Sequence, residues 1–183
     1  MTDLIGTENI NNVEGLDGTG QPAATYFKKS TAAFAGAGGS FSSAEVDTTT
    51  TTLLNIPGLT ATLKSGTYRF HCGLPGTAGA LGGVKYAFSY SGMTLTSIDV
   101  TGKAFTTAAV AVQHTTTTAS GTSLLSSTSA AIYSEIDGVV VISGTGIAPT
   151  GATLQLQFAQ SAASATTSSV YANASMQFVK IGV

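Results

Sequence analysis

Few side chains in this 183-residue chain have the reactivity that catalysis or metal binding needs. The chain contains one cysteine, Cys72, and two histidines, His71 and His114. Because His71 and Cys72 are neighbours in a stretch with strand periodicity, their side chains point to opposite faces and do not form a nucleophile–base pair or share a metal ion. We expect Cys72 to be a small buried apolar residue. His71 is expected on the outer face beside Arg69 or at a subunit interface, and His114 in a loop.

The carboxylates form no recognisable catalytic pattern. Asp99, Glu135 and Asp137 would resemble the paired acids of glycosidases if they met in space, but no motif brings them together. Two isolated histidines do not provide the roughly four ligands of a zinc site. The glycine cluster at residues 36–39 lacks the spacing of a phosphate-binding loop. The sequence therefore predicts no catalytic residue, cofactor or metal ion, and a protein that is not an enzyme.

The clearest signal in the chain is the alternation of apolar and polar residues, which predicts strands with one buried face. It is strongest in three segments, 67–74, 84–90 and 153–158. A further extended run, 170–181, follows a polar loop, and we expect these last strands to pair with strands from earlier in the chain. Alternating aromatic residues are either core or a platform for sugar stacking, and core is favoured; they are Tyr68, Phe70, Tyr86, Phe88 and Tyr90.

Turn signals separate the predicted strands. We expect turns at Ile56-Pro57-Gly58, Ser65-Gly66, Ser91-Gly92 and Asp137-Gly138. The apolar phase slips between Leu95 and Ile98, which predicts a bulge, and residues 115–118 are expected in an exposed loop. About eight to ten strands and no amphipathic helix indicate an all-β, antiparallel jelly-roll sandwich.

The composition points to a protein with covered surfaces. Charged residues make up 9% of the chain, against about 25% in an ordinary soluble domain, while 43% are hydrophobic. Such a surface suits a subunit whose faces are covered by copies of itself. The net charge of −2 argues against binding to nucleic acid or to an anionic membrane. The chain shows no signal peptide and no apolar run long enough to span a membrane, so we expect synthesis in a reducing cytoplasm.

The chain divides into an N-terminal arm, residues 1–22, and one domain, residues 23–183. The arm contains four acidic residues and no Lys or Arg, and it has no apolar periodicity. It is either an acidic disordered tail or a segment that orders on a neighbouring surface. In the second case its apolar side chains would provide the attachment; they are Leu4, Ile5, Ile10, Val13 and Leu16.

Several segments together resemble a known group of proteins. The segments are Leu59–Leu63, Ser65–Phe70, Lys85–Ser89, Gly151–Gln160 and Ser175–Ile181, with a Gly-Thr-Tyr strand and a Leu-x-Phe-Ala-Gln strand as markers. They resemble tailed-bacteriophage virion proteins, a likeness that covers about residues 48 to 183. The resemblance implies a tumour necrosis factor-like jelly roll that is usually a homotrimer, as in capsid decoration, head-fibre and related fibre proteins. It brings no catalytic residues.

We therefore expect a homotrimeric decoration or head-fibre protein on the outside of a phage capsid. It would be made in the host bacterial cytoplasm and bound through residues 1–22 to the major capsid protein or another virion protein. Val139–Ile142 is apolar on both faces, so this strand needs a second cover, and Val140 and Ile142 are the predicted trimer contacts. The alternative is a tail-fibre knob that binds a receptor or a host surface glycan through loops 73–83 and 114–123.

Overall fold

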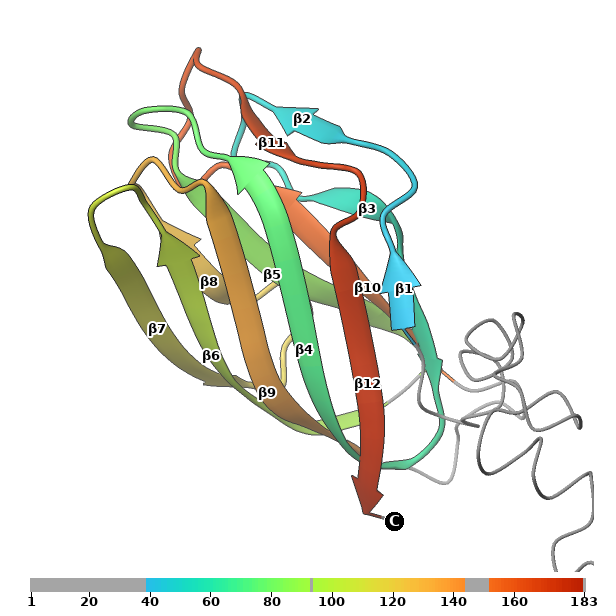
Figure 1. Ribbon diagram of the computed structural model, residues 1–183. Helices are drawn as coiled ribbons and strands as arrows, with labels where there is room; N and C mark the ends of the chain where they lie inside the picture. The colour runs from blue at the N-terminus through green and yellow to red at the C-terminus, as the bar shows by residue number, and fades with distance from the viewer. Residues whose placement is uncertain (1–38, 93, 144–151, 183) are drawn as a thin grey trace, which may run out of the picture.

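The computed structural model describes residues 39–92, 94–143 and 152–182, and the regular elements in these ranges are all β-strands (Figure 1). None of the described residues forms a helix long and apolar enough to cross a membrane. The strands are β1 (Gly39–Phe41), β2 (Val46–Thr48), β3 (Leu54–Leu63), β4 (Gly66–Thr77), β5 (Val84–Ser91), β6 (Thr94–Phe105), β7 (Val110–Thr117), β8 (Ser123–Ser127), β9 (Tyr133–Ser143), β10 (Ala152–Ala159), β11 (Ser168–Val170) and β12 (Ser175–Gly182).

The strands form two antiparallel sheets packed face to face. The larger sheet has the order β1-β12-β4-β9-β6-β7, and the smaller sheet has the order β3-β10-β5-β8. Four of the antiparallel pairs, β1–β12, β3–β10, β4–β9 and β5–β8, are those of one long hairpin rolled into two layers. This is the jelly-roll arrangement. The prediction of an all-β antiparallel sandwich is confirmed.

Four further strands, β2, β6, β7 and β11, extend the larger sheet. The β6–β7 hairpin is inserted between β5 and β8, and its strand β6 pairs with β9 along almost its whole length. In Figure 1 this hairpin widens the front sheet on the side away from β1. The short strand β11 pairs with both β2 and β4 at the upper end of the same sheet. The larger sheet is consequently wider than the smaller one and has a broad outer side.

The core lies between the two sheets and is built from the faces that the alternation predicted. Tyr68, Phe70 and Cys72 project inward from β4, and Tyr86 and Phe88 project inward from β5. The ring centroids of Phe70 and Phe88, one from each sheet, lie 5.3 Å apart in an edge-to-face contact. The aromatic residues on these strands are therefore core, and the sugar-stacking alternative does not hold for the buried ones.

The last strands of the chain are central, as their sequence predicts. β10 lies between β3 and β5, and β12 lies between β1 and β4. Leu154, Leu156 and Phe158 of β10 are completely buried. The loop that joins β10 to β11 is fixed by Gln160, which is also completely buried and whose Nε2 donates to the carbonyl of Thr166.

The chain bulges where the apolar phase slips, but three local expectations are wrong. The pairing of β6 with β9 shifts between Leu95 and Ser97, which confirms the bulge. Pro57-Gly58 does not reverse the chain and lies inside the edge strand β3, where Gly58 (φ 84°) accommodates an irregularity instead. Residues 115–118 are not a loop, because Thr115–Thr117 belongs to β7.

Asp137-Gly138 is also not a turn, since both residues lie in the middle of β9. Gly138 serves close packing there. A Cβ at this position would lie 2.5 Å from the carbonyl oxygen of Asp99 and 2.9 Å from Cζ of Phe70. The Asp137-Gly138 pair, a turn signal in the sequence, thus marks a point where β9 packs closely against neighbouring residues.

Candidate functional site

The side chains that could bind a ligand or take part in a reaction lie on one surface, the outer side of the larger sheet, which we call the charged face. Residues directly opposite each other in antiparallel strands project to the same side. One row across the sheet runs from His71 on β4 through Asp137 on β9 and Thr101 on β6 to His114 on β7. The next row contains Arg69, Val139 and Asp99, and the row on the other side contains Glu135, Lys103 and Val112.

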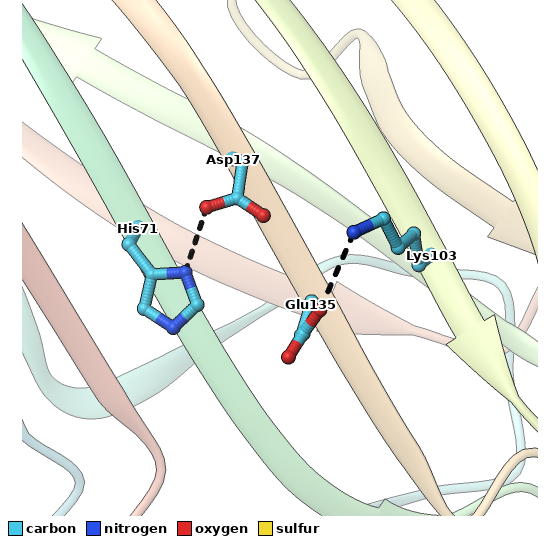
Figure 2. A network of polar contacts seen from close by, with 4 residues as sticks. All are labelled: His71, Lys103, Glu135 and Asp137. Atoms are coloured by element: carbon cyan, nitrogen blue, oxygen red, sulfur yellow. Dashed lines mark hydrogen bonds and ion pairs between the residues drawn. The ribbon is translucent and has the colours of Figure 1, made fainter.

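Three ion pairs cross this face between neighbouring strands. His71 Nδ1 lies 2.8 Å from Asp137 Oδ1, and His114 Nε2 lies 2.7 Å from Asp99 Oδ1. Lys103 Nζ lies 3.7 Å from Glu135 Oε2 (Figure 2). His71 and Asp137 are also hydrogen-bonded, with the ring N–H of His71 donating to the carboxylate. These side chains are partly exposed to water, so each pair contributes only about 0.2–1 kcal/mol to stability.

A shallow hollow of about 410 Å³ lies between the two histidine pairs. Its walls include Arg69, Asp99, His114, Asp137, Val139 and Ile181. Arg69 is exposed and has no ion-pair partner in the described part of the chain. The hollow thus offers a guanidinium as donor, two carboxylates as acceptors and an apolar floor, a combination suited to binding polar groups.

The charged face also exposes large apolar side chains, and these lie at its two edges. Among the described residues, nine large hydrophobic side chains are exposed, and five of them project from this face. Phe41, Val179 and Ile181, at 62%, 58% and 58% exposure, lie on β1 and β12. Val110 and Val112, at 49% and 64%, lie on β7 at the opposite edge. Exposed apolar side chains gathered on one face are typical of an interaction surface.

Cys72 and His71 lie on opposite sides of β4, as predicted. Cys72 is completely buried, and burial raises the pKa of its thiol far above the ordinary value, with the carboxylate of Asp137 adding to the shift. Within the described residues, neither imidazole hydrogen-bonds a hydroxyl or thiol group that could act as a nucleophile. The same ranges contain no group of three or more His, Cys, Asp or Glu side chains that could hold a metal ion.

The three carboxylates that the sequence left open do share the charged face, but each pairs with a different basic side chain. Asp137 pairs with His71, Asp99 with His114, and Glu135 with Lys103. Burial raises the pKa of Tyr133, and Glu135 and Asp137 add to this shift through their charge. Each acid therefore has its own basic partner, and the three do not form an isolated acid pair.

The predicted trimer contacts need a correction. Val140 and Ile142 are 0% and 2% exposed and belong to the core between the two sheets of one chain, so they offer no surface to a second copy. The side chains of β9 on the charged face are those of Val139 and Val141, which are partly exposed. The strand is apolar on both sides, as predicted, but Val140 and Ile142 lie on its inner side.

The two loops expected to form a receptor site lie at opposite ends of the sandwich. Gly79 in the first loop accepts a hydrogen bond from Gly83 and contacts Thr166, at the upper end in Figure 1. The backbone N–H of Gly121 in the second donates to Phe88 near the other end of β5. They cannot contact one ligand together. The attachment residues Leu4, Ile5, Ile10, Val13 and Leu16, and the boundary at residue 22, lie outside the described residues.

Sequence reasoning missed the pairing of His114 with Asp99 because it placed His114 in a loop. The alternation of Val110, Val112 and His114 with partly buried residues was the available signal, since it continues the strand through the threonine run.

Comparison with known proteins finds no family model that matches the chain and no matching curated protein.

Proposed function

We propose that this chain is a structural protein of a tailed-phage virion, a homotrimeric decoration or head-fibre protein held on the outside of the capsid by its N-terminal segment. The resemblance of its strand motifs to such proteins supports this assignment. The jelly-roll sandwich agrees with the fold that the resemblance implies. Its partners would be two further copies of itself and a capsid protein.

The observation that carries the proposal is the exposure of apolar side chains on the charged face. A monomer would leave Phe41, Val112 and Val179 in water, in a chain whose charged residues amount to only 9%. Weak charge and exposed apolar groups favour association. Covering these side chains in a homotrimer removes them from water and accounts for the composition.

The edge position of β1 supports attachment through the preceding residues. β1 is the outermost strand of the larger sheet beyond β12, and the chain enters it at Gly39. A segment joined to an edge strand can reach a neighbouring surface without crossing its own domain. Three copies of residues 1–22 in a trimer would add avidity if all three engage the capsid.

Two measurements test this function. Size exclusion coupled to light scattering should give three times the chain mass of 18.2 kDa. Deletion of residues 1–22 should leave the trimer and its melting temperature unchanged but abolish incorporation into particles, with the full-length chain as control. A soluble monomer would overturn the homotrimer, and a truncated protein that still decorates particles would overturn attachment through the arm.

A receptor-binding knob is the second candidate, and one loop favours it. Leu81 has φ 70° and is 83% exposed, a strained backbone that presents an apolar side chain to water. The loop is held in place because Gly82 N–H and Gly83 N–H donate to Gly79 C=O, and Ala162 N–H donates to Gly82 C=O. Binding on a glycan array that is lost in Leu81→Ser would support a knob, and a blank array would count against it.

A further inference from the structure

Gly73 leaves a gap among the side chains of the charged face, and three polar atoms surround it. The residue lies on the outer side of β4, directly opposite Ser175 of β12 and Glu135 of β9. A Cβ at this position would lie 2.9 Å from Tyr133 Oη, 3.2 Å from Ser175 Oγ and 3.7 Å from His71 Nε2. Side chains from three neighbouring strands thus direct a polar atom into one space, which we call the Gly73 gap.

Within residues 39–92, 94–143 and 152–182, none of these three atoms has a hydrogen-bond partner in the protein. His71 donates from Nδ1 to Asp137, so Nε2 of the neutral ring keeps a lone pair, and Figure 2 shows it on the side of the ring away from Asp137. Burial raises the pKa of Tyr133, with the charges of Glu135 and Asp137 adding to the shift, so the phenol keeps the proton that it can donate. The Gly73 gap therefore offers one acceptor and two hydroxyl groups that can each donate and accept.

An apolar row of side chains borders the Gly73 gap. The adjacent row across the sheet runs from Pro75 through Tyr133 and Phe105 to Val110, and all four residues are at least partly exposed. The ring centroids of Tyr133 and Phe105 lie 5.7 Å apart. These two rings lie on the outside of the sandwich, unlike the aromatic residues of the core. Polar groups beside an exposed aromatic surface suit a ligand that has both hydroxyl groups and apolar C–H faces.

The charges around the Gly73 gap favour a neutral ligand. Glu135 and Asp137 would repel an anion, as their effect on the pKa of Tyr133 shows. A cation would need a carboxylate of its own, because removing a charge from water is costly without a partner. Both acids already have basic partners, since Asp137 pairs with His71 and Glu135 pairs with Lys103.

We propose that the Gly73 gap binds a neutral saccharide. One sugar hydroxyl donates to His71 Nε2, a second exchanges hydrogen bonds with Tyr133 and Ser175, and the C–H face of the sugar ring packs on the aromatic row. Asp137 positions His71 and also lines the hollow of about 410 Å³, so the surface beside the gap is concave. This site goes beyond the proposed function and uses no residue of the loop that contains Leu81.

An oligosaccharide array followed by calorimetric titration tests the site. The full chain is applied to an array of neutral and acidic oligosaccharides, and its affinity for the neutral oligosaccharide that binds most tightly is then measured. Ser175→Ala and Tyr133→Phe each remove one hydroxyl group and keep the rest of the side chain. Each should weaken binding about threefold to tenfold, the loss expected for one hydrogen bond between uncharged groups. The double variant should weaken it about tenfold to a hundredfold.

Ser89→Ala is the matched control. Ser89 is half-exposed, like Ser175, but it lies on β5 in the smaller sheet, so this variant should bind as the parent chain does. Gly73→Ala places a methyl group in the gap itself and should abolish binding. Circular dichroism and the melting temperature verify that each variant is folded, and the two hydroxyl deletions keep the test decisive if Gly73→Ala does not fold.

Three results would each overturn the site: a blank array, binding of acidic oligosaccharides alone, or a double variant that binds as tightly as the parent chain. Binding that is lost in Leu81→Ser and kept in the double variant would assign the saccharide to the loop and also overturn the site. The homotrimer and the attachment through residues 1–22 are tested separately, by light scattering and by incorporation into particles, so they can stand when the saccharide site fails.

Discussion

The two outer faces of the sandwich differ in the kinds of side chain that they expose and in the contacts that these side chains make. On the smaller sheet, the outward residues of β3, β10 and β5 other than Lys85 are mostly uncharged and polar, and we call this surface the amide face; they include Asn55, Thr60, Thr62, Ser89, Thr153, Gln155 and Gln157. Gln157 Nε2 donates to Asn55 Oδ1 at 2.9 Å, and Thr60 Oγ1 donates to Gln155 Oε1. The charged face combines ion pairs with two clusters of exposed apolar side chains.

The two faces differ in what a partner would gain by covering them. Polar side chains of the amide face bond to one another and to water, so nothing on that face favours burial. On the charged face, Val112 and Val179 gain free energy when they leave water, at about 25 cal/mol per Å² of apolar surface. The amide face thus exposes polar side chains that water can hydrogen-bond, while the charged face also exposes apolar side chains that water cannot.

The largest effect is expected where the two faces share a core. Phe70 lies beneath the charged face and packs on Phe88 and Phe178, while Phe158 lies beneath the amide face and packs on Tyr86. Phe70→Ala and Phe158→Ala should each lower the free energy of unfolding by roughly 3–5 kcal/mol, because each leaves a cavity. Urea unfolding at a fixed protein concentration measures both. A small effect at either position would show that its side chain is not part of a tight core.

A carboxylate introduced on each face in turn should test directly whether the two faces differ. Val110→Asp is expected to weaken the proposed trimer by roughly 3 kcal/mol, about a hundredfold in dissociation constant, because it buries a carboxylate directly opposite Phe105 of β6. Thr62→Asp on the amide face is the matched control and should leave the trimer unchanged. Sedimentation at decreasing concentration gives the constants. Equal effects at the two positions would contradict the distinction between the faces.

Alkaline pH should lower the stability of the fold through Cys72, which lies on the inner side of β4. Burial raises the pKa of Cys72, so above about pH 8.5 the unfolded chain loses the thiol proton while the folded chain keeps it. Stability is thus retained below that pH and lost above it, by about 1.4 kcal/mol per pH unit and about 2 kcal/mol at pH 10. Burial also raises the pKa of Tyr86, which extends the loss above about pH 10.

Urea unfolding between pH 7 and 10 measures this loss, with Cys72→Ala as the control. The variant is less stable at every pH, but its stability should stay level up to about pH 10, where tyrosine begins to titrate. A decline in the variant as steep as in the parent chain would assign the effect to other groups.

The smallest effect is expected at the outer edge of the charged face. The side chains of His114 and Asp99 are 65% and 56% exposed, so water already competes with their ion pair. His114→Ala should change the free energy of unfolding by no more than about 0.5 kcal/mol. Differential scanning calorimetry at neutral pH is sufficient to measure this change in stability. A loss of several kcal/mol would mean that the histidine is buried in the assembled protein.

Inward and outward faces could be predicted because alternation is a local property of the chain. Tyr68, Phe70 and Cys72 had to share a side once the segment was a strand, and His71 had to lie on the other. The bulge near Leu95 was visible for the same reason. Turn signals were less dependable, since Gly138 is selected by the close approach of Phe70 and not by a change of chain direction.

The sequence by itself determined an all-β chain of low charge with its apolar faces defined and with Cys72 turned away from His71. Only the tertiary structure decided which distant residues meet, because the pairing register of strands far apart in the chain depends on how the whole hairpin rolls up. It brings Asp137 to His71 across 66 residues. It also covers Val140 and Ile142 with the second sheet and leaves Val112 and Val179 on opposite edges of one exposed face.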